Sequence, residues 1–257
     1  MKSTWIAGLP LVTCLAAPVA QAVELRMLSA GAVELGLTPT LALFQHDSGH
    51  TVRVSFAAAP AIAAQFTTAP GYDIVIAPPA VLDALARAGA VGSDRVTIGR
   101  VGIGIAVRAS ANVPDVTSVE NLKQALLSAE SVVFNRASTG LYVEVLLQKL
   151  GIADAVEAKA TRYPDGASIM RHLLAGTKPR EFGLGATTEI VLFKDQGLKL
   201  VGPLPAAVQN YTTYVAALPA GPALDKARSD AAAALMQHLQ GSQAGATFAN
   251  AGIEPAP

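Results

Sequence analysis

The feature that most constrains this chain is an alternation of strand-like and helix-like segments that is interrupted twice by an extended run. Short apolar segments alternate with segments whose apolar residues recur at helical spacing, which is typical of a mostly parallel sheet flanked by helices. The two interruptions, residues 95–107 and 210–218, each lie between α/β blocks. A run of this kind can leave one sheet and enter another. We therefore predict an α/β fold with two lobes, each a mostly parallel sheet flanked by helices, joined by two crossing strands.

The predicted lobes are discontinuous in sequence because the chain crosses between them twice. Lobe 1 takes residues 23–104 and 209–257, and lobe 2 takes residues 105–208. A single α/β domain is the alternative, since the division rests on the rhythm of the segments. The remaining predicted strands are 24–29, 51–56, 72–77, 131–135, 158–163, 182–185 and 198–201, and the predicted helices are 33–46, 61–66, 78–88, 117–129, 141–150, 166–175, 187–194, 224–239 and 244–251.

The first 22 residues have the layout of a secretory signal peptide. Lys2 gives a positive start, residues 5–19 are almost wholly apolar and uncharged, and Ala20-Gln21-Ala22 supplies the small residues of a cleavage site. We predict cleavage after Ala22 and a periplasmic mature protein. A membrane anchor is disfavoured because the apolar run is shorter than the roughly 20 residues a bilayer requires. Lipidation at Cys14 is disfavoured because Thr13 fits that motif poorly.

Composition excludes several classes of function. Cys14 is the only cysteine, so the mature chain has no disulfide, thiol nucleophile or cysteine metal site. The whole chain has 19 basic and 19 acidic residues, and loss of Lys2 with the leader leaves a formal charge of −1. This charge does not favour binding to nucleic acid. The four histidines match no metal motif, and no nucleophile elbow is present. The sequence therefore predicts no cofactor, no metal site and no catalytic residue.

Turns rich in small residues follow several of the predicted strands. Ligands of parallel α/β sheets bind at the carboxyl ends of the strands, where small residues expose backbone N–H groups at helix starts to an anion. One such turn alone is ordinary capping, but several of them in two lobes predict an anion-binding cleft. Arg136 is the most specific candidate, as a clamp for a carboxylate or oxyanion, with a plain surface arginine as its alternative. The predicted ligand-binding residues are Ser29, Ala30, Gly31, Ala58, Arg136, Ser138, Thr139, Gly140, Ala186 and Thr187.

The order and spacing of these segments resemble those of a known family. They are residues 28–32, 72–77, 138–152, 182–190 and 201–214. Together they resemble the periplasmic solute-binding proteins of ABC importers, in the molybdate-type branch. The resemblance implies a type II periplasmic-binding-protein fold that closes on a small anion. It also implies a monomer that delivers its ligand to a membrane permease with its ATPase.

The ligand turns depart from the molybdate pattern. The family usually has a serine in the second turn, where this chain has residues 57–59 as three alanines, and a tyrosine near Ala186. A hydrogen bond to a charged group contributes about 1.5–3 kcal/mol, so the loss of two donors disfavours molybdate and tungstate. Arg136 adds a charge instead. We therefore predict a small organic acid as the ligand in preference to a molybdate-like oxyanion.

Two other functions fit the same cleft. An extracytoplasmic enzyme would need a general base near the turns, for which Asp165 and Glu189 are the candidates, although capping or solvation explains both. A sensor module would present its closed form to a receptor instead of a permease. The family resemblance favours binding without chemistry, so the expectation is that the protein is not an enzyme.

Overall fold

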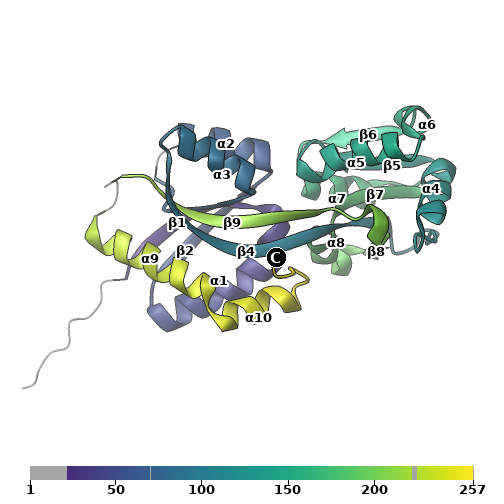
Figure 1. Ribbon diagram of the computed structural model, residues 1–257. Helices are drawn as coiled ribbons and strands as arrows, with labels where there is room; N and C mark the ends of the chain where they lie inside the picture. The colour runs from purple at the N-terminus through teal and green to yellow at the C-terminus, as the bar shows by residue number, and fades with distance from the viewer. Residues whose placement is uncertain (1–21, 70, 222–224, 257) are drawn as a thin grey trace, which may run out of the picture.

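The computed structural model describes residues 22–69, 71–221 and 225–256. The predicted leader, apart from Ala22, lies outside these residues. The described strands run in the order β2-β1-β3-β9-β4-β7-β5-β6, with β8 paired to β4. Figure 1 shows helices on both faces of the strands and two groups of elements, one on each side of the molecule. The predicted α/β class with flanking helices is confirmed.

The first group contains both ends of the described chain. Strand β1 pairs in parallel with β2 and β3, and β9 pairs antiparallel with β3 and β4. Helices α2 and α3 lie on one face of these strands, and α1, α9 and α10 lie on the other (Figure 1). The bounds are β1 Glu24–Ala30, η1 Gly31–Val33, α1 Glu34–Ser48, β2 Thr51–Ala57, α2 Ala59–Thr68, β3 Ile74–Ala77, α3 Pro79–Arg87, β4 Val91–Arg108, β9 Tyr211–Pro219, α9 Lys226–Gln240 and α10 Ser242–Asn250.

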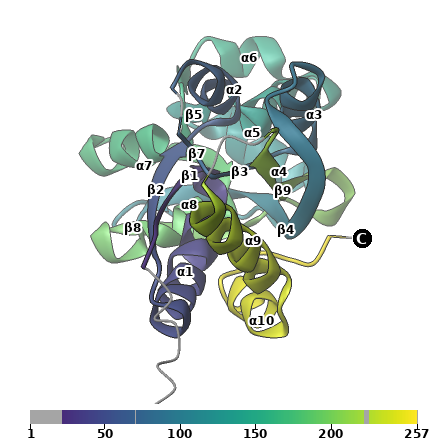
Figure 2. The same ribbon diagram turned by 90° about the vertical axis from the view of Figure 1, so that its left-hand side faces the viewer.

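The second group is the middle of the chain. Strand β5 pairs in parallel with β6 and β7, whereas β7 and β8 run antiparallel to β4. The bounds are α4 Val119–Ser128, β5 Ser131–Asn135, α5 Ser138–Lys149, α6 Ala153–Glu157, β6 Ala160–Tyr163, α7 Gly166–Ala175, β7 Glu181–Ala186, α8 Thr187–Leu192, η2 Lys194–Gln196, β8 Leu198–Pro203 and η3 Ala206–Val208. The end-on view in Figure 2 shows how these elements lie behind the first group.

Strand β4 belongs to both groups. Its first part pairs with β9, whereas residues from Ile103 to Arg108 pair with β7 and β8. The strand bends at a register shift beside Gly99, whose φ of 148° favours glycine. The segment that leads back into β9 is held by Gln209. Its amide oxygen accepts from the Ile103 N–H at 2.9 Å, and its amide nitrogen donates to the Ile103 carbonyl at 3.0 Å.

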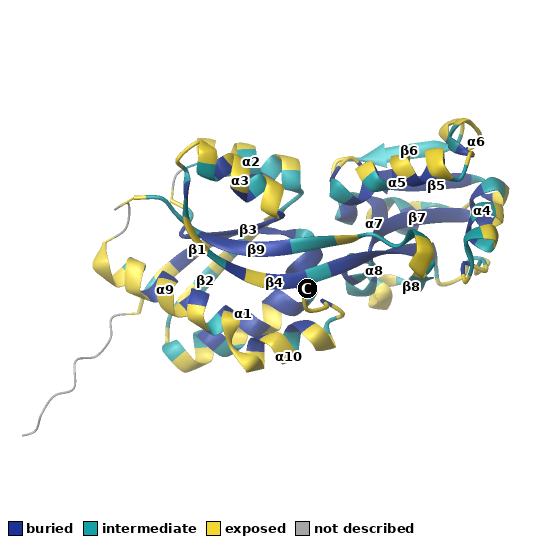
Figure 3. Cartoon of the chain, in the orientation of Figure 1, coloured by how far each residue is buried: buried dark blue, intermediate teal, exposed yellow. Residues whose placement is uncertain are grey.

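The apolar cores follow the two groups. One cluster gathers the inner faces of β1, β3, β4 and β9 with α1 and α9, and two further clusters lie on either face of the β5–β7 strands. The central strands β3, β5 and β7 are accordingly buried, whereas β2, β6 and β8 and the outer helix faces are more exposed (Figure 3). Ala186 packs into the first cluster although it ends β7, and the Thr188 hydroxyl donates to the Ala32 carbonyl at 2.5 Å. Helix α8 therefore connects the two groups of elements. The limits of the two lobes remain the prediction made from the sequence.

Some local predictions differ from the structure. The helix after residue 117 is capped by Ser118, whose hydroxyl accepts from the Asn121 N–H, because Thr117 donates its own hydroxyl to Asp115. The short helix α6 falls inside a region without a clear sequence period. Strand β8 contains the predicted strand 198–201 and pairs antiparallel with β4, an exception to the mostly parallel pattern. Within the described residues, no helix combines the length and apolarity needed to span a membrane.

Candidate functional site

A cavity of about 580 Å³ lies where helices begin in both groups of elements. Its walls come from the turns after β1 and β2, the first turns of α5 and α7, the α8–η2 segment and β9. This is the carboxyl edge of the parallel strands, where such sheets present their ligands. The lining residues are Ala30, Gly31, Ala32, Glu34, Phe56, Ala57, Ala58, Ala59, Asn135, Ala137, Ser138, Thr139, Asp165, Gly166, Ala167, Arg171, Glu189, Leu192, Phe193, Gln196 and Tyr214.

The wall formed by the turns after β1 and β2 is made chiefly of small residues. The turn of Ala30, Gly31 and Ala32 opens η1, and three alanines follow Phe56 at the start of α2. Side chains this short leave the backbone at a helix start accessible to a ligand, and the N–H groups there carry a partial positive charge. This wall therefore suits an anion without contributing any cationic side chain.

The turn between β5 and α5 is tied by one side chain. The amide oxygen of Asn135 accepts hydrogen bonds from the N–H groups of Ala137 and Gly140 at 3.0 and 2.9 Å. Only glycine fits at position 140, because a Cβ there would lie 1.5 Å from the Asn135 carbonyl oxygen. The tight turn places Ser138 and Thr139 in the cavity wall at the first turn of α5.

Glu189 is the most unusual group in the cavity. Its carboxyl packs against two glycines, where a Cβ on Gly31 would lie 3.0 Å from Oε1 and one on Gly166 only 1.9 Å from Oε2. Among the described residues none forms a hydrogen bond to it. Burial, followed by the charges of Asp165 and Glu34, raises the pKa of Glu189 to about 7. A carboxyl with this pKa exchanges protons readily near neutral pH.

The neighbouring acidic and phenolic groups are held differently. Asp165 caps α7 by accepting the Ser168 N–H at 2.7 Å. Burial raises the pKa of Glu34, at the start of α1. Burial and the charge of Glu189 also raise the pKa of Tyr214, so its phenol stays neutral and able to donate. In the described part of the chain, no group of three histidine, cysteine or acidic side chains could hold a metal ion.

The cationic group in the cavity is not the one expected from sequence. Arg136 is exposed and does not line the cavity, because the tight turn that buries Asn135 and Ala137 leaves this side chain outside. Arg171, from the second turn of α7, is the basic side chain among the described residues that line the cavity. Its Nη2 donates to Ser168 Oγ at 3.1 Å and lies 4.0 Å from Asp165 Oδ1.

The other predicted site residues divide in two. Ala30, Gly31, Ala58, Ser138 and Thr139 line the cavity. The other four do not line it. Ser29 is buried and its hydroxyl donates to the Ala30 carbonyl, and Gly140 packs against the backbone carbonyl of Asn135. Ala186 lies in the core, and Thr187 is half-buried. Sequence reasoning missed Glu34, Phe56, Arg171 and Tyr214. Of these, Arg171 carried a usable signal, because it falls one turn after the Asp165–Ser168 cap on the same helix.

Residues from both groups of elements line one cavity, an arrangement that suits the binding of a small solute. The sequence profile of the bacterial extracellular solute-binding protein family matches residues 25–254. The chain belongs to this family, and the predicted membership of the solute-binding proteins is confirmed.

Solved structures agree with this assignment of the fold. A periplasmic molybdate-binding protein from Azotobacter vinelandii is similar with a TM-score of 0.75 and 18% identity, over 91% of this chain and 100% of that one. A sulfate-binding protein from Mycobacterium tuberculosis is similar with a TM-score of 0.71 and 15% identity, over 91% and 87%. A tungstate-binding protein from Desulfovibrio alaskensis has a TM-score of 0.60 and 16% identity, over 87% and 92%.

A curated relative points to chemistry as well as binding. An aconitate isomerase from Pseudomonas sp. is 28% identical over 246 residues, which cover 91% of this chain and 88% of the relative. This finding contradicts the expectation that the protein is not an enzyme. That expectation followed the family resemblance, which carried no information on whether a bound anion reacts.

Proposed function

We propose that the protein binds a small unsaturated polycarboxylate in the cavity and shifts a proton within it, as the isomerisation of aconitate requires. The observation that carries the proposal is the carboxyl of Glu189, which lines the cavity without a hydrogen bond and has its pKa raised to about 7. The relative named as an aconitate isomerase supports the substrate class. The predicted preference for an organic acid over molybdate is part of this proposal.

The proposed step needs only one base. Aconitate is a propene that carries one carboxylate on each of its three carbons. The Glu189 carboxylate removes a proton from the methylene end carbon, and the electrons of that C–H bond form a new double bond to the middle carbon. The electrons of the old double bond pass to the other end carbon, which takes a proton from the Glu189 carboxyl, either the one just removed or one exchanged with solvent. One C–H bond breaks and one forms, and the new double bond can be cis or trans.

The cavity walls suit the charge that develops in this step. Removal of the proton spreads negative charge over the allyl carbons and their carboxylates. The first residues of η1, α5 and α7 line the cavity, helix starts carry a partial positive charge on their N–H groups, and the neutral phenol of Tyr214 adds a donor. Donors fixed before the reaction stabilise such charge without reorganising. Asp165 is a weaker candidate for the base, because its carboxylate already caps α7.

Interconversion of cis- and trans-aconitate tests this function directly. The purified mature protein, mixed with either isomer, is expected to produce the other, as followed by chromatography. Glu189→Gln keeps the shape of the side chain but cannot carry the proton, so kcat is expected to fall about 100- to 10,000-fold. Glu120→Gln, at an exposed residue of α4 outside the cavity, is the matched control and should retain full activity. No conversion by the natural chain, or full activity of Glu189→Gln, contradicts the proposal.

Delivery of the same acid to an ABC permease and its ATPase is a second candidate function. The family match and the similarity to molybdate-, sulfate- and tungstate-binding proteins favour it. The extracellular family also supports the predicted periplasmic location. Thermal shift with aconitate and with molybdate separates the ligands, since saturation at about 100 times Kd adds about 2.7 kcal/mol of stability. Stabilisation by molybdate alone would contradict the proposed organic acid.

A further inference from the structure

The cavity is poor in positive charge for a site that takes a polyanion. Three of its lining residues are acidic, Glu34, Asp165 and Glu189, and they leave Arg171 as the cationic side chain among the described lining residues. Backbone N–H groups can hold two carboxylates at the helix starts. A third carboxylate, however, would meet acidic neighbours unless it lay against the guanidinium. The position of Arg171 therefore decides which carboxylates the site accepts.

Two contacts direct the guanidinium toward the start of α7. Nη2 donates to Ser168 Oγ at 3.1 Å, and the same nitrogen lies 4.0 Å from Asp165 Oδ1. Long side chains on a helix lean toward its N-terminus, which agrees with these contacts. Only one of the five N–H donors is used by Ser168, so the rest can hold a carboxylate with two parallel bonds. The side chain is 63% exposed, so it reaches a ligand in the cavity without leaving a packed position.

The base lies at the same helix start. Gly166, the first residue of α7, is in contact with the Glu189 carboxyl, and Arg171 follows five residues later. Five residues of helix span about 7.5 Å, and the backward lean of Arg171 shortens that separation. A three-carbon tricarboxylate can therefore touch both groups at once.

The proposed reaction selects one carboxylate for this contact. The proton shift exchanges the roles of the two end carbons, and a change between cis and trans moves an end carboxylate. The carboxylate on the middle carbon keeps its place throughout. A cation that holds the substrate during the whole step must therefore bind the middle carboxylate.

We propose that Arg171 binds the middle carboxylate of a tricarboxylate and so selects it over a dicarboxylate of the same chain length, an inference that rests on the proposed function. Arg171 is thus a specificity-determining residue. Arg136, the cation singled out from sequence, has no such role because it does not line the cavity.

Two saturated ligands test this inference without any reaction. Tricarballylate has the three carboxylates of aconitate but no double bond, and glutarate has the same chain without the middle carboxylate. Titration calorimetry of Arg171→Gln should show tricarballylate weakened roughly 10- to 100-fold, the loss of a charge-assisted hydrogen bond. Glutarate affinity should change far less. Arg171→Lys keeps the charge but lacks the paired N–H donors of the guanidinium, so its tricarballylate affinity should lie between those of the natural chain and Arg171→Gln.

Arg136→Gln is the matched control, an exposed arginine of the same lobe, and should bind both ligands like the natural chain. Equal weakening of both ligands in Arg171→Gln, or loss of tricarballylate selectivity in Arg136→Gln, overturns the inference. An unchanged unfolding temperature confirms that the variants fold. The proposed function fails in a different way, by the natural chain binding neither ligand. Selective tricarballylate binding without aconitate turnover would support the role of Arg171 in binding and would contradict only the proposed proton shift.

Discussion

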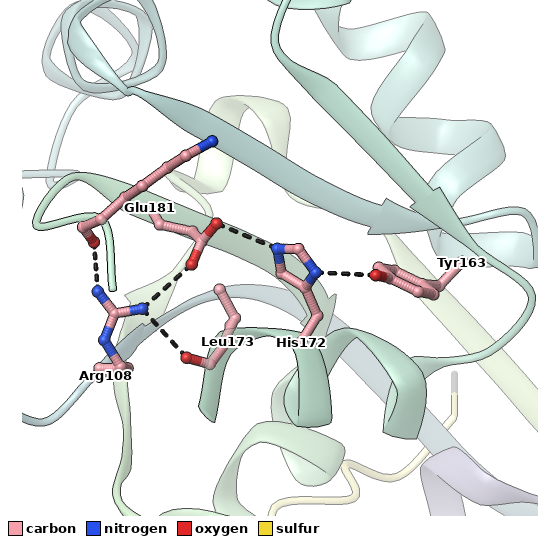
Figure 4. A network of polar contacts seen from close by, with 6 residues as sticks. Arg108, Tyr163, His172, Leu173 and Glu181 are labelled. Atoms are coloured by element: carbon pink, nitrogen blue, oxygen red, sulfur yellow. Dashed lines mark hydrogen bonds and ion pairs between the residues drawn. The ribbon is translucent and has the colours of Figure 1, made fainter. Parts of the chain in front are cut away.

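The β7–α8 unit carries two carboxylates in opposite circumstances. Glu181, at the start of β7, is 3% exposed and accepts hydrogen bonds from Arg108 and His172 at 3.1 Å each (Figure 4). Glu189, on α8, lines the cavity and has no hydrogen bond from any described residue. The two residues are close in sequence and identical in chemistry, so the difference between them arises from their surroundings alone.

The partners of Glu181 form a chain of polar contacts within the second group of elements. Arg108 also donates to the carbonyls of Leu173 and Lys178, and the Tyr163 hydroxyl lies 2.8 Å from Nδ1 of His172. An ionised carboxylate can only accept, so Nε2–H of His172 donates to Glu181, and the Tyr163 hydroxyl pairs with Nδ1 on the other side of the ring. These contacts join β4, β6, β7 and α7 through the residues labelled in Figure 4. The comparison teaches that a satisfied buried carboxylate supports the fold, whereas an unsatisfied one in a cavity is available for proton transfer.

The largest expected effect on stability comes from the satisfied carboxylate. Glu181→Gln leaves the 13% exposed Arg108 without its countercharge, so the free energy of unfolding should fall by about 3–5 kcal/mol. Urea denaturation measures this loss. Activity per folded molecule should survive, because Glu181 does not line the cavity. A stable variant would show that the network in Figure 4 contributes little to the fold.

The opposite change is expected at Glu189. Its pKa is raised from 4.5 to about 7 in the folded protein, so the folded state holds a proton that the unfolded state has released between these values. Stability is therefore full below about pH 4.5 and is lost as the pH rises toward 7. Glu189→Gln removes this loss and should stabilise the protein by up to about 3 kcal/mol at pH 8, with little change at pH 4.

Urea denaturation at the two pH values, with Glu120→Gln alongside, measures this difference. A Glu189→Gln variant that is less stable than the natural chain at pH 8 would mean that the carboxylate has a stabilising partner, which contradicts the comparison.

The smallest effect is expected at the far end of the Glu181 network. Tyr163→Phe keeps the ring beside His172 but removes the hydroxyl, so stability should fall by about 1 kcal/mol, the contribution of one hydrogen bond. Thermal unfolding measures it. Tyr211→Phe is the control, since Tyr211 is 38% exposed, and should change nothing. Equal effects of both variants would show that the Tyr163–His172 contact is not a stabilising bond.

The fold was predictable further than the site. Strand β5 and helix α7 have the bounds expected from sequence, because a buried apolar run and an Asp165 cap are local signals. Helix α5 begins three residues earlier than expected, because the Asn135 side chain accepts hydrogen bonds from the backbone at the start of the helix. The spacing of apolar residues does not reveal such a contact. Local patterns thus place most elements but not the side chains that tie them.

The site could be predicted only in part. The small turns at Gly31 and Ser138 were recognised because they follow strands, and they line the cavity. The sequence favoured Arg136, whereas Arg171 lines the cavity, because only some residues of a turn face a cavity. Glu189 was a candidate base, but its pKa depends on contact with Gly31 and Gly166, which lie far away in sequence. Such an environment exists only after folding.

Proton exchange in D₂O tests the central claim most directly. With the natural chain, NMR should show deuterium entering the end carbons of aconitate at a rate comparable to isomerisation, because the proton on Glu189 exchanges with solvent. Glu189→Gln should show neither exchange nor isomerisation, while still binding tricarballylate. Deuterium entry at an undiminished rate in Glu189→Gln would contradict the account, since another group would then be removing the proton.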